Sequence, residues 1–160
     1  MNKILLTAAA LLLTACGFHL KGTPGTTQPL PYQTWSVNGN IMQQALENAL
    51  RRADGKPESA AKAQAELNVI GIQTRRDVYT ITRAALINEY LLMLRVEVQV
   101  SRKGEPVGKP IRVEVYRTMD YSDSEVLGKA EEEQTIWSEM RADAADQIVR
   151  QLAFLNSAAQ

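Results

Sequence analysis

The hydrophobic positions in the middle of the chain recur at every second residue, which predicts β-strands with one buried face. The segment from Ile87 to Ser101 shows this most clearly, and the segment from Ile111 to Met119 repeats it. A third strand is predicted from Leu67 to Thr82, with a bulge near Arg75-Arg76-Asp77, where the alternation slips. Each strand has one apolar and one mixed face, so we expect an antiparallel sheet that is covered on one side only.

Helical spacing of apolar residues appears on both sides of these strands. A short strand at Gln33–Val37 precedes a predicted helix over about 41–53, for which Asn40 is the expected N-cap. A long helix is predicted to open at Ser122–Glu125, where the two end residues have capping-box spacing. Its apolar stripe consists of Trp137, Met140, Ala144, Ile148, Leu152 and Leu155.

The order of these elements predicts an α+β fold. We expect a two-layer sandwich in which two helices pack on one face of a mostly antiparallel four-stranded sheet. Residues 102–108 are a turn-rich connection between strands, and the polar start of the long helix, 129–133, is expected to project beyond the sheet. The Ala-rich residues 59–65 are compatible with either a loop or a further helical turn.

The N-terminal residues have the organisation of a bacterial lipoprotein signal. Lys3 supplies a positive charge, an apolar run covers residues 4–13, and small residues lead into Cys16, the one cysteine of the chain. As a helix, this run would rise only about 15 Å, roughly half of a bilayer core, so it cannot span the membrane. We therefore expect a lipoprotein signal peptide at residues 1–15 and lipidation of Cys16. The alternative is an ordinary secretory peptide that leaves Cys16 as a free thiol.

Composition divides the remaining chain into a tether and a domain. Residues 16–31 are rich in Gly, Pro, Thr and Gln, which is typical of a flexible tether, here a lipidated one. Residues 32–160 are long enough for a single domain with one core. Without residues 1–15 the chain has 17 basic and 18 acidic side chains, because Lys3 is lost from 18 of each. This balance offers no general attraction to nucleic acid.

The residue inventory does not favour an enzyme. The only histidine, His19, lies in the expected tether, which cannot hold an imidazole against a catalytic base or a metal. Zinc would need three or four Cys or His ligands, so neither a metal nor a cofactor is expected. Glu131-Glu132-Glu133 is a run of carboxylates, but adjacent helical positions point apart, so it is interpreted as a solvated face.

The residues after the expected cleavage site are distinctive. Cys16-Gly17-Phe18-His19-Leu20-Lys21-Gly22 resembles the mature N-terminus of the LptE family of lipopolysaccharide-assembly lipoproteins, formerly called rare lipoprotein B. Three later features fit the same family: the hairpin at Arg83, Asn88-Glu89-Tyr90 at the start of a strand, and Val115-Tyr116-Arg117 before the long helix. The resemblance covers essentially the whole mature chain and implies the two-layer fold described above.

The resemblance also implies a function. LptE proteins plug the large outer-membrane barrel LptD, help this barrel to fold and assist delivery of lipopolysaccharide to the cell surface. We therefore expect a complex with one LptD and contact with lipopolysaccharide. Cys16 would carry fatty acyl chains such as palmitate and anchor the protein in the outer membrane, with the domain on the periplasmic side or within the barrel lumen. Position 17 is Gly rather than the Asp that commonly retains lipoproteins in the inner membrane.

Two basic residues are candidates for contact with lipopolysaccharide. Arg83 is expected at the tip of the Leu67–Ser101 hairpin, and Lys129 early in the long helix, toward the same end of the domain. A guanidinium and an ammonium both bind phosphate, which lipid A carries. The alternative is that each is an ordinary solvated charge.

The candidate barrel contacts are more diffuse. Met93, Arg95, Arg112 and Tyr116 are expected on the uncovered face of the sheet, where they suit a polar barrel lumen. A solvated open face would have the same composition. Trp137 and Tyr90 are expected in the core, whereas Tyr32 and Trp35 are compatible with either core or contact positions.

A second functional class remains open from the sequence. The protein could be a free-standing, membrane-tethered carrier or sensor of lipopolysaccharide without an obligate barrel partner. Such a carrier needs a deep apolar pocket for acyl chains, whereas the apolar faces of this sequence are required between the sheet and the helices.

Overall fold

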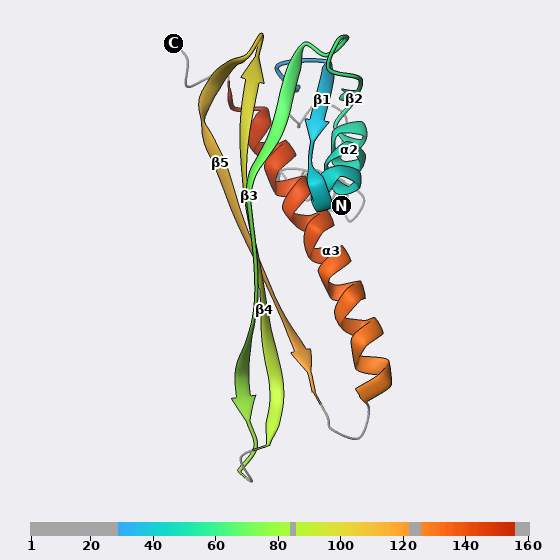
Figure 1. Ribbon diagram of the computed structural model, residues 1–160, viewed down its shortest axis with the longest axis vertical. Coiled ribbons are helices and arrows are strands. Elements are labelled where there is room, and N and C mark those ends of the chain that lie inside the picture. The colour runs from blue at the N-terminus through green and yellow to red at the C-terminus, as the bar shows by residue number, and fades with distance from the viewer. Residues whose placement is uncertain (1–28, 84–85, 122–125, 156–160) are drawn as a thin grey trace, which may run out of the picture.

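A long twisted sheet forms one layer of the domain, and two helices form the other (Figure 1). The computed structural model describes residues 29–83, 86–121 and 126–155. The strands are β1 (Thr34–Asn38), β2 (Lys56–Pro57), β3 (Ala65–Ile81), β4 (Ile87–Arg102) and β5 (Glu105–Asp120). The helical elements are the 3-10 turn η1 (Asn40–Met42), α2 (Gln43–Arg52) and α3 (Val126–Leu152). The predicted α+β class and the placement of both helices on one face are confirmed.

The sheet has five strands in the order β2-β1-β3-β4-β5 and is mixed, so the predicted four-stranded sheet is wrong in this detail. β1 pairs in parallel with β2 and β3, whereas the β3–β4 and β4–β5 pairs are antiparallel. The parallel half arises because α2 crosses back over the sheet before the chain re-enters it. β2 is too short to show an alternating pattern. The N–H groups of Lys56 and Glu58 hold this edge by donating to the carbonyls of Gln33 and Trp35 at 2.8 Å.

The connections around the sheet follow local backbone chemistry. Residues 59–64 form a turn rather than a helix, with the Lys62 N–H 2.9 Å from the Ser59 carbonyl. The β4–β5 hairpin closes through only Lys103 and Gly104, whose φ angles of 51° and 83° suit a two-residue loop. The expected connection at 102–108 is therefore shorter, and most of it belongs to β5.

The expected bulge at residues 75–77 is wrong, because pairing with β4 is unbroken from Gly71 to Val78. The register shifts instead before Gly71 and after Val78. The alternation slips at 75–77 for another reason: all three residues are exposed on β3, which is an edge strand at this point. Arg76 lies opposite the buried Leu92, yet it stays polar because it pairs with Glu133 of α3 instead of entering the core.

The hydrophobic core fills the space between the sheet and the helices. α3 contributes the predicted stripe as far as Leu152, and Leu155 is buried just beyond the end of this helix. β4 and β5 contribute the predicted alternating residues. Fully buried members include Trp35, Leu46, Leu50, Leu67, Leu92, Leu94, Val96, Val98, Met140, Ala144, Ile148 and Leu152. The capping box at Ser122–Glu125 lies outside the described residues.

The start of the first helical segment differs from the expected one. Asn40 is not the N-cap, because it lies inside η1 with a positive φ of 49°. Gly39 precedes the turn, and its N–H donates to the side-chain Oε1 of Gln43 at 2.8 Å. A glutamine one turn later therefore satisfies the backbone group at this helix end.

The polar beginning of α3 does not project beyond the sheet. Glu133 forms an ion pair with Arg76 of β3, with 2.9 Å between the nitrogen and oxygen atoms. The β3–β4 hairpin instead continues past the start of the helix, so that the hairpin end is the part that projects (Figure 1). Among the described residues, this geometry leaves one end that consists of the β3 and β4 strands alone (Figure 1).

Candidate functional site

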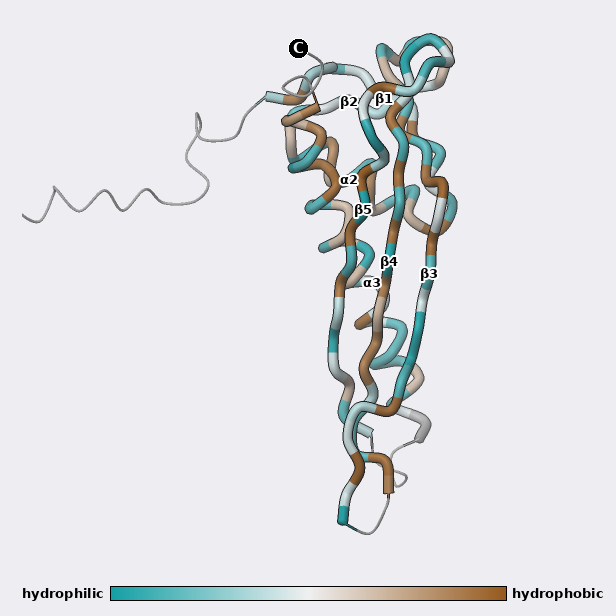
Figure 2. The backbone as a smooth tube through the Cα atoms, turned by 90° about the vertical axis from the view of Figure 1, so that its left-hand side faces the viewer, coloured by the Kyte–Doolittle hydropathy of each residue, from teal (hydrophilic) through white to brown (hydrophobic). Residues whose placement is uncertain are grey.

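The uncovered face of the sheet brings the four expected barrel-contact residues together. Met93 lies opposite Tyr116 across the β4–β5 ladder, and Arg95 lies opposite Glu114. Arg112 lies two positions before Glu114 on β5 and opposite Glu97. Figure 2 looks onto this face, with the helices behind the three long strands. The alternation of the sequence thus places these residues on the predicted face.

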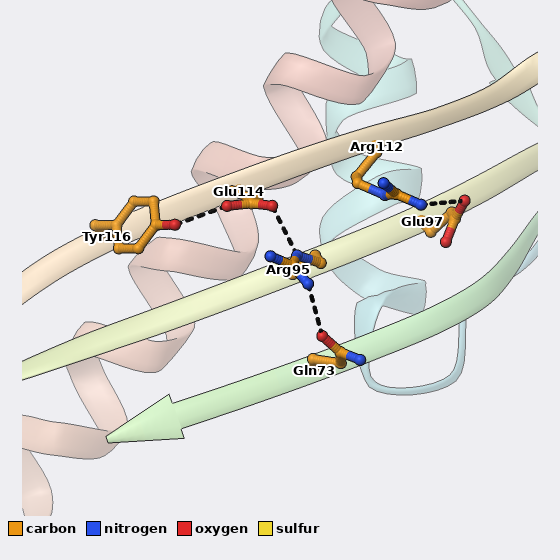
Figure 3. Close-up of polar contacts among 6 residues, drawn as sticks. All are labelled: Gln73, Arg95, Glu97, Arg112, Glu114 and Tyr116. Atoms are coloured by element: carbon orange, nitrogen blue, oxygen red, sulfur yellow. Dashed lines mark hydrogen bonds and ion pairs between the residues drawn. The ribbon is translucent and has the colours of Figure 1, made fainter. Parts of the chain in front are cut away.

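Polar side chains on this face form a hydrogen-bonded ladder across three strands (Figure 3). The Tyr116 hydroxyl donates to Glu114 Oε2 at 2.7 Å, and Arg95 Nε donates to Glu114 Oε1 at 2.7 Å. A second nitrogen of Arg95 donates to Gln73 Oε1 on β3 at 3.1 Å. Alongside it, Arg112 donates to Glu97 at 3.1 Å. The ladder links the strands through side chains and leaves its ionic charges balanced.

The ladder has a defined protonation state. Hydrogen bonds from Tyr116 and then from Arg95 lower the pKa of Glu114 below its ordinary value of 4.5. The Glu114 carboxylate raises the pKa of Tyr116 above its ordinary value of 10.0. At neutral pH the carboxyl group is therefore ionised and the phenol remains a donor. The face presents fixed donors and acceptors over a wide range of pH.

The residues of this face differ in their availability to a partner. Tyr116 is 49% exposed, whereas Met93 is only 7% exposed. Met93 therefore contributes less to an external contact than its position suggests. Gln73 and Glu114, the partners of Arg95, are not among the contact residues predicted from the sequence. The alternation of polar residues in β3 and β5 is the signal that identifies their face.

Arg83 lies at the end of the β3–β4 hairpin, as predicted, and is exposed. The hairpin is closed by the Thr82 N–H, 2.7 Å from the Leu86 carbonyl. The Leu86 N–H in turn donates to the Thr82 hydroxyl at 3.2 Å. Within the described ranges, the Arg83 guanidinium has no ion-pair partner.

Lys129 lies in the first turn of α3, at the same end of the molecule as the hairpin (Figure 1). The structure therefore agrees with the predicted placement of both basic residues toward one end. The Lys129 ammonium is already engaged, since it lies 2.8 Å from a carboxylate oxygen of Glu132. Its side chain is only 16% exposed. Of the two candidates, Arg83 is the more accessible cation.

The aromatic residues near the start of the domain belong to its packing. Trp35 is fully buried, and its indole Nε1 donates to the Tyr32 carbonyl at 2.8 Å. Tyr32 packs edge-on against it, with 5.5 Å between the ring centroids. This resolves the open alternative for Trp35 in favour of the core. Tyr90 and Trp137 are half-buried and pack against the core, as expected.

A shallow groove runs between β3 and α3 beside this packing. Its lining consists of Thr74, Arg75, Arg76, Glu133, Trp137 and Arg141. Glu133 accepts hydrogen bonds from both Arg76 and the Trp137 indole. These contacts join the outer half of β3 to α3. We therefore interpret the groove as part of the packing between this strand and this helix.

The described residues hold no group of three or more His, Cys, Asp or Glu side chains that could bind a metal ion. None of the helices in this part of the chain has the length and apolarity that crossing a membrane requires. Cys16 and His19 lie outside the described residues. Two surfaces of the described residues are accessible to a partner: the polar sheet face and the projecting hairpin end (Figure 2).

Comparison with known proteins finds a family model and relatives that match this chain. A family model described as LptE, lipopolysaccharide-assembly, matches residues 31–152. The LPS-assembly lipoprotein LptE of Pectobacterium atrosepticum is 32% identical over 159 residues, which cover 96% of this chain and 85% of that protein. The protein of the same name from Yersinia enterocolitica is also 32% identical, over 97% of this chain and 76% of its own length.

Solved structures of other lipoproteins share the fold. The uncharacterized lipoprotein B from Nitrosomonas europaea has a TM-score of 0.67 at 22% identity, covering 89% of this chain and 94% of that one. The rare lipoprotein B from Shewanella oneidensis has a TM-score of 0.63 at 23% identity, covering 79% and 96%. At this level of identity the likeness concerns the architecture alone.

Proposed function

The chain belongs to the LptE family of lipopolysaccharide-assembly lipoproteins, and from this premise we propose that it plugs and helps to assemble the LptD barrel. In this proposal one copy of the protein sits with one copy of LptD in the outer membrane and assists delivery of lipopolysaccharide to the cell surface. Residues 1–15 act as the signal peptide, Cys16 carries the lipid, and residues 16–31 tether the domain to the membrane.

The observation that carries the plug proposal is the polar ladder on the uncovered sheet face. Barrels of this kind have polar interiors, so a plug must offer donors and acceptors rather than an apolar surface. Glu114 joins Tyr116 and Arg95 at 2.7 Å each, and this pre-ordered network loses little side-chain freedom on contact. The balanced charges also avoid burying an unpaired ion against the barrel wall.

The fold disfavours the alternative of a free-standing carrier. The apolar side chains between the sheet and the helices are packed against one another, and Leu94, Val96 and Ile148 are at most 1% exposed. Acyl chains could enter this layer only by separating the helices from the sheet. A surface contact with a partner requires no such opening.

Contact with lipopolysaccharide is the second part of the proposal. Arg83 is an exposed guanidinium at a projecting tip, and a guanidinium binds phosphate through two parallel hydrogen bonds. Lys129 lies at the same end and would add positive charge after releasing Glu132. We assign both residues to the phosphates of lipopolysaccharide, with Arg83 as the primary contact.

The plug proposal is tested by charge reversal on the sheet face. Arg112→Glu places a third negative charge beside Glu97 and Glu114, so the full-length lipoprotein should recover much less LptD from outer membranes. Arg51→Glu is the matched control, because Arg51 on α2 is also an exposed arginine paired with a glutamate. Equal recovery of LptD with both variants would contradict the role assigned to the sheet face.

A further inference from the structure

The end of the β3–β4 hairpin concentrates exposed apolar side chains. Val78, Tyr79, Ile81 and Leu86 are 51–62% exposed, and they are four of the eight large apolar side chains exposed in the described part of the chain. The hydropathy colouring shows the apolar character of this end beyond the region that faces the helix (Figure 2). Single exposed apolar residues are ordinary, but a cluster marks a contact surface.

No element within residues 29–83, 86–121 and 126–155 covers this cluster. β1 pairs with β3 only from Ala65 to Asn68, so the outer part of β3 has a free edge. The second layer is absent as well, because the hairpin runs past the start of α3 (Figure 1). Two strands without a covering layer cannot bury their own side chains.

The two threonine hydroxyls of the hairpin end, at Thr80 and Thr82, are engaged within the hairpin. The Thr80 hydroxyl donates to Glu89 Oε2 at 2.8 Å, and the Thr82 hydroxyl accepts from the Leu86 N–H at 3.2 Å. A protein interface of ordinary composition has about one hydrogen bond per 100–200 Å². The side chains of this end offer few free groups for such bonds, which favours an apolar ligand.

The single positive charge of the hairpin end indicates which kind of apolar ligand fits it. From Val78 to Asn88 the sequence contains one charged side chain, Arg83, and positions 84 and 85 are alanines. An exposed cation beside exposed aliphatic and aromatic side chains complements an amphiphile that has an anionic head and hydrocarbon chains. A neutral lipid would leave the guanidinium without a partner.

We propose that Tyr79, Ile81 and Leu86 bind the acyl chains of the lipopolysaccharide whose phosphate Arg83 contacts. This inference rests on the lipopolysaccharide contact in the proposed function and is independent of the barrel contact. The hairpin end then lies at the boundary between the head group and the acyl chains of the bound lipopolysaccharide. The cation faces the phosphate, and the apolar side chains face the acyl chains.

The first test uses the full-length lipoprotein in cells. A photo-cross-linking phenylalanine analogue is placed at position 81 or 86, and for comparison at Ile41 or Phe154, which are equally exposed at 54% and 57%. After irradiation, adducts are detected with antibodies to lipopolysaccharide and to LptD. Lipopolysaccharide adducts should be several times stronger at 81 and 86 than at the control positions. Adducts to LptD alone at 81 and 86, or equal adducts at all positions, would overturn the proposal.

The second test separates the acyl chains from the phosphates. The purified full-length protein is titrated with intact lipopolysaccharide and with chemically deacylated lipopolysaccharide that keeps its phosphates. Ile81→Asn and Leu86→Asn should each weaken binding of the intact form about tenfold and leave the deacylated form unchanged. Wild-type affinity of both variants for the intact form would refute the acyl-chain contact.

Arg83→Gln tests the proposed function separately. It should weaken binding of both the intact and the deacylated form, because both retain the phosphates. Unchanged binding of both forms by Arg83→Gln would remove the phosphate contact, whereas the apolar variants would still report on the acyl chains. Recovery of LptD by each variant serves as the check that the domain is folded.

Discussion

Arg117 on β5 and Asp143 on α3 form an ion pair across the boundary between the sheet and the helix, with 2.9 Å between nitrogen and oxygen. Asp143 also accepts a hydrogen bond from Gln147 Nε2 at 3.1 Å. That hydrogen bond is the largest cause that lowers the pKa of Asp143 below its ordinary value of 3.8. Partial burial acts in the opposite direction, and Arg117 lowers the pKa further.

This arrangement predicts a pH dependence of stability. A carboxyl group whose pKa is lower in the folded state stabilises the fold above its unfolded pKa, and the contribution is lost as the pH falls through the folded value. The free energy of unfolding of wild-type protein should therefore exceed that of Asp143→Asn above about pH 5, and the difference should shrink below about pH 4. Urea denaturation at a series of pH values measures it, and a constant difference over that range would contradict the assignment.

The core predicts a large effect for truncation at Leu94. Leu94 is 1% exposed beneath the helices, so Leu94→Ala should reduce the free energy of unfolding by about 2–5 kcal/mol. The control is Leu86→Ala, which removes the same atoms from a side chain that is 56% exposed and should cost at most about 0.5 kcal/mol. Similar losses for the two variants in chemical denaturation would show that the sheet face under the helices is not the core.

Alanine substitutions at two glycines are expected to change the stability of the protein in opposite directions. A Cβ at Gly39 would lie 2.5 Å from Gln43 Cα, so Gly39→Ala should destabilise the protein by about 1–3 kcal/mol through backbone displacement. A Cβ at Gly128, in α3, meets nothing within 4 Å. Gly128→Ala should therefore stabilise the helix by up to about 1 kcal/mol. Thermal unfolding distinguishes the two, and a stabilising Gly39→Ala would contradict the described turn.

The expected lipidation predicts the location of a Cys16→Ser variant. When the chain is produced in excess over LptD, the wild-type protein should sediment with membranes, whereas Cys16→Ser should remain in the soluble periplasmic fraction. The variant loses the acyl chains on which stable anchoring depends. Mass spectrometry of the wild-type N-terminus checks the modification directly, and an unmodified cysteine would remove the anchor from the account.

Where one face of an element is buried and the other is not, the sequence pattern predicts the structure well. The two-residue period of β4 correctly places Leu92 and Leu94 in the core and Arg95 on the opposite face. The same rule places Tyr116 and Arg112 next to Arg95, because antiparallel neighbours share a face. The two-residue period reveals which side chains are buried only along the part of a strand that packs against the core.

Features that depend on partners distant in the sequence are not visible in such a pattern. β2 exists because β1 offers it a free edge, and its two residues are too few to alternate. In the sequence, Trp35 lies beside the expected tether, where an aromatic residue could equally be a surface residue. It is buried because the helices cover it, and these helices come later in the chain. The sequence alone does not show that Tyr79, Ile81 and Leu86 are exposed. Their exposure follows from the position of α3, which begins short of the hairpin end.

We propose that this domain works inside a complex with LptD. The most direct measurement is purification of the full-length, tagged lipoprotein from detergent-extracted outer membranes, followed by determination of the subunit ratio by native mass spectrometry. We expect a stable complex with one copy of each protein, and poor maturation of LptD in cells depleted of the lipoprotein. Recovery of the lipoprotein alone from membranes that contain mature LptD would contradict it.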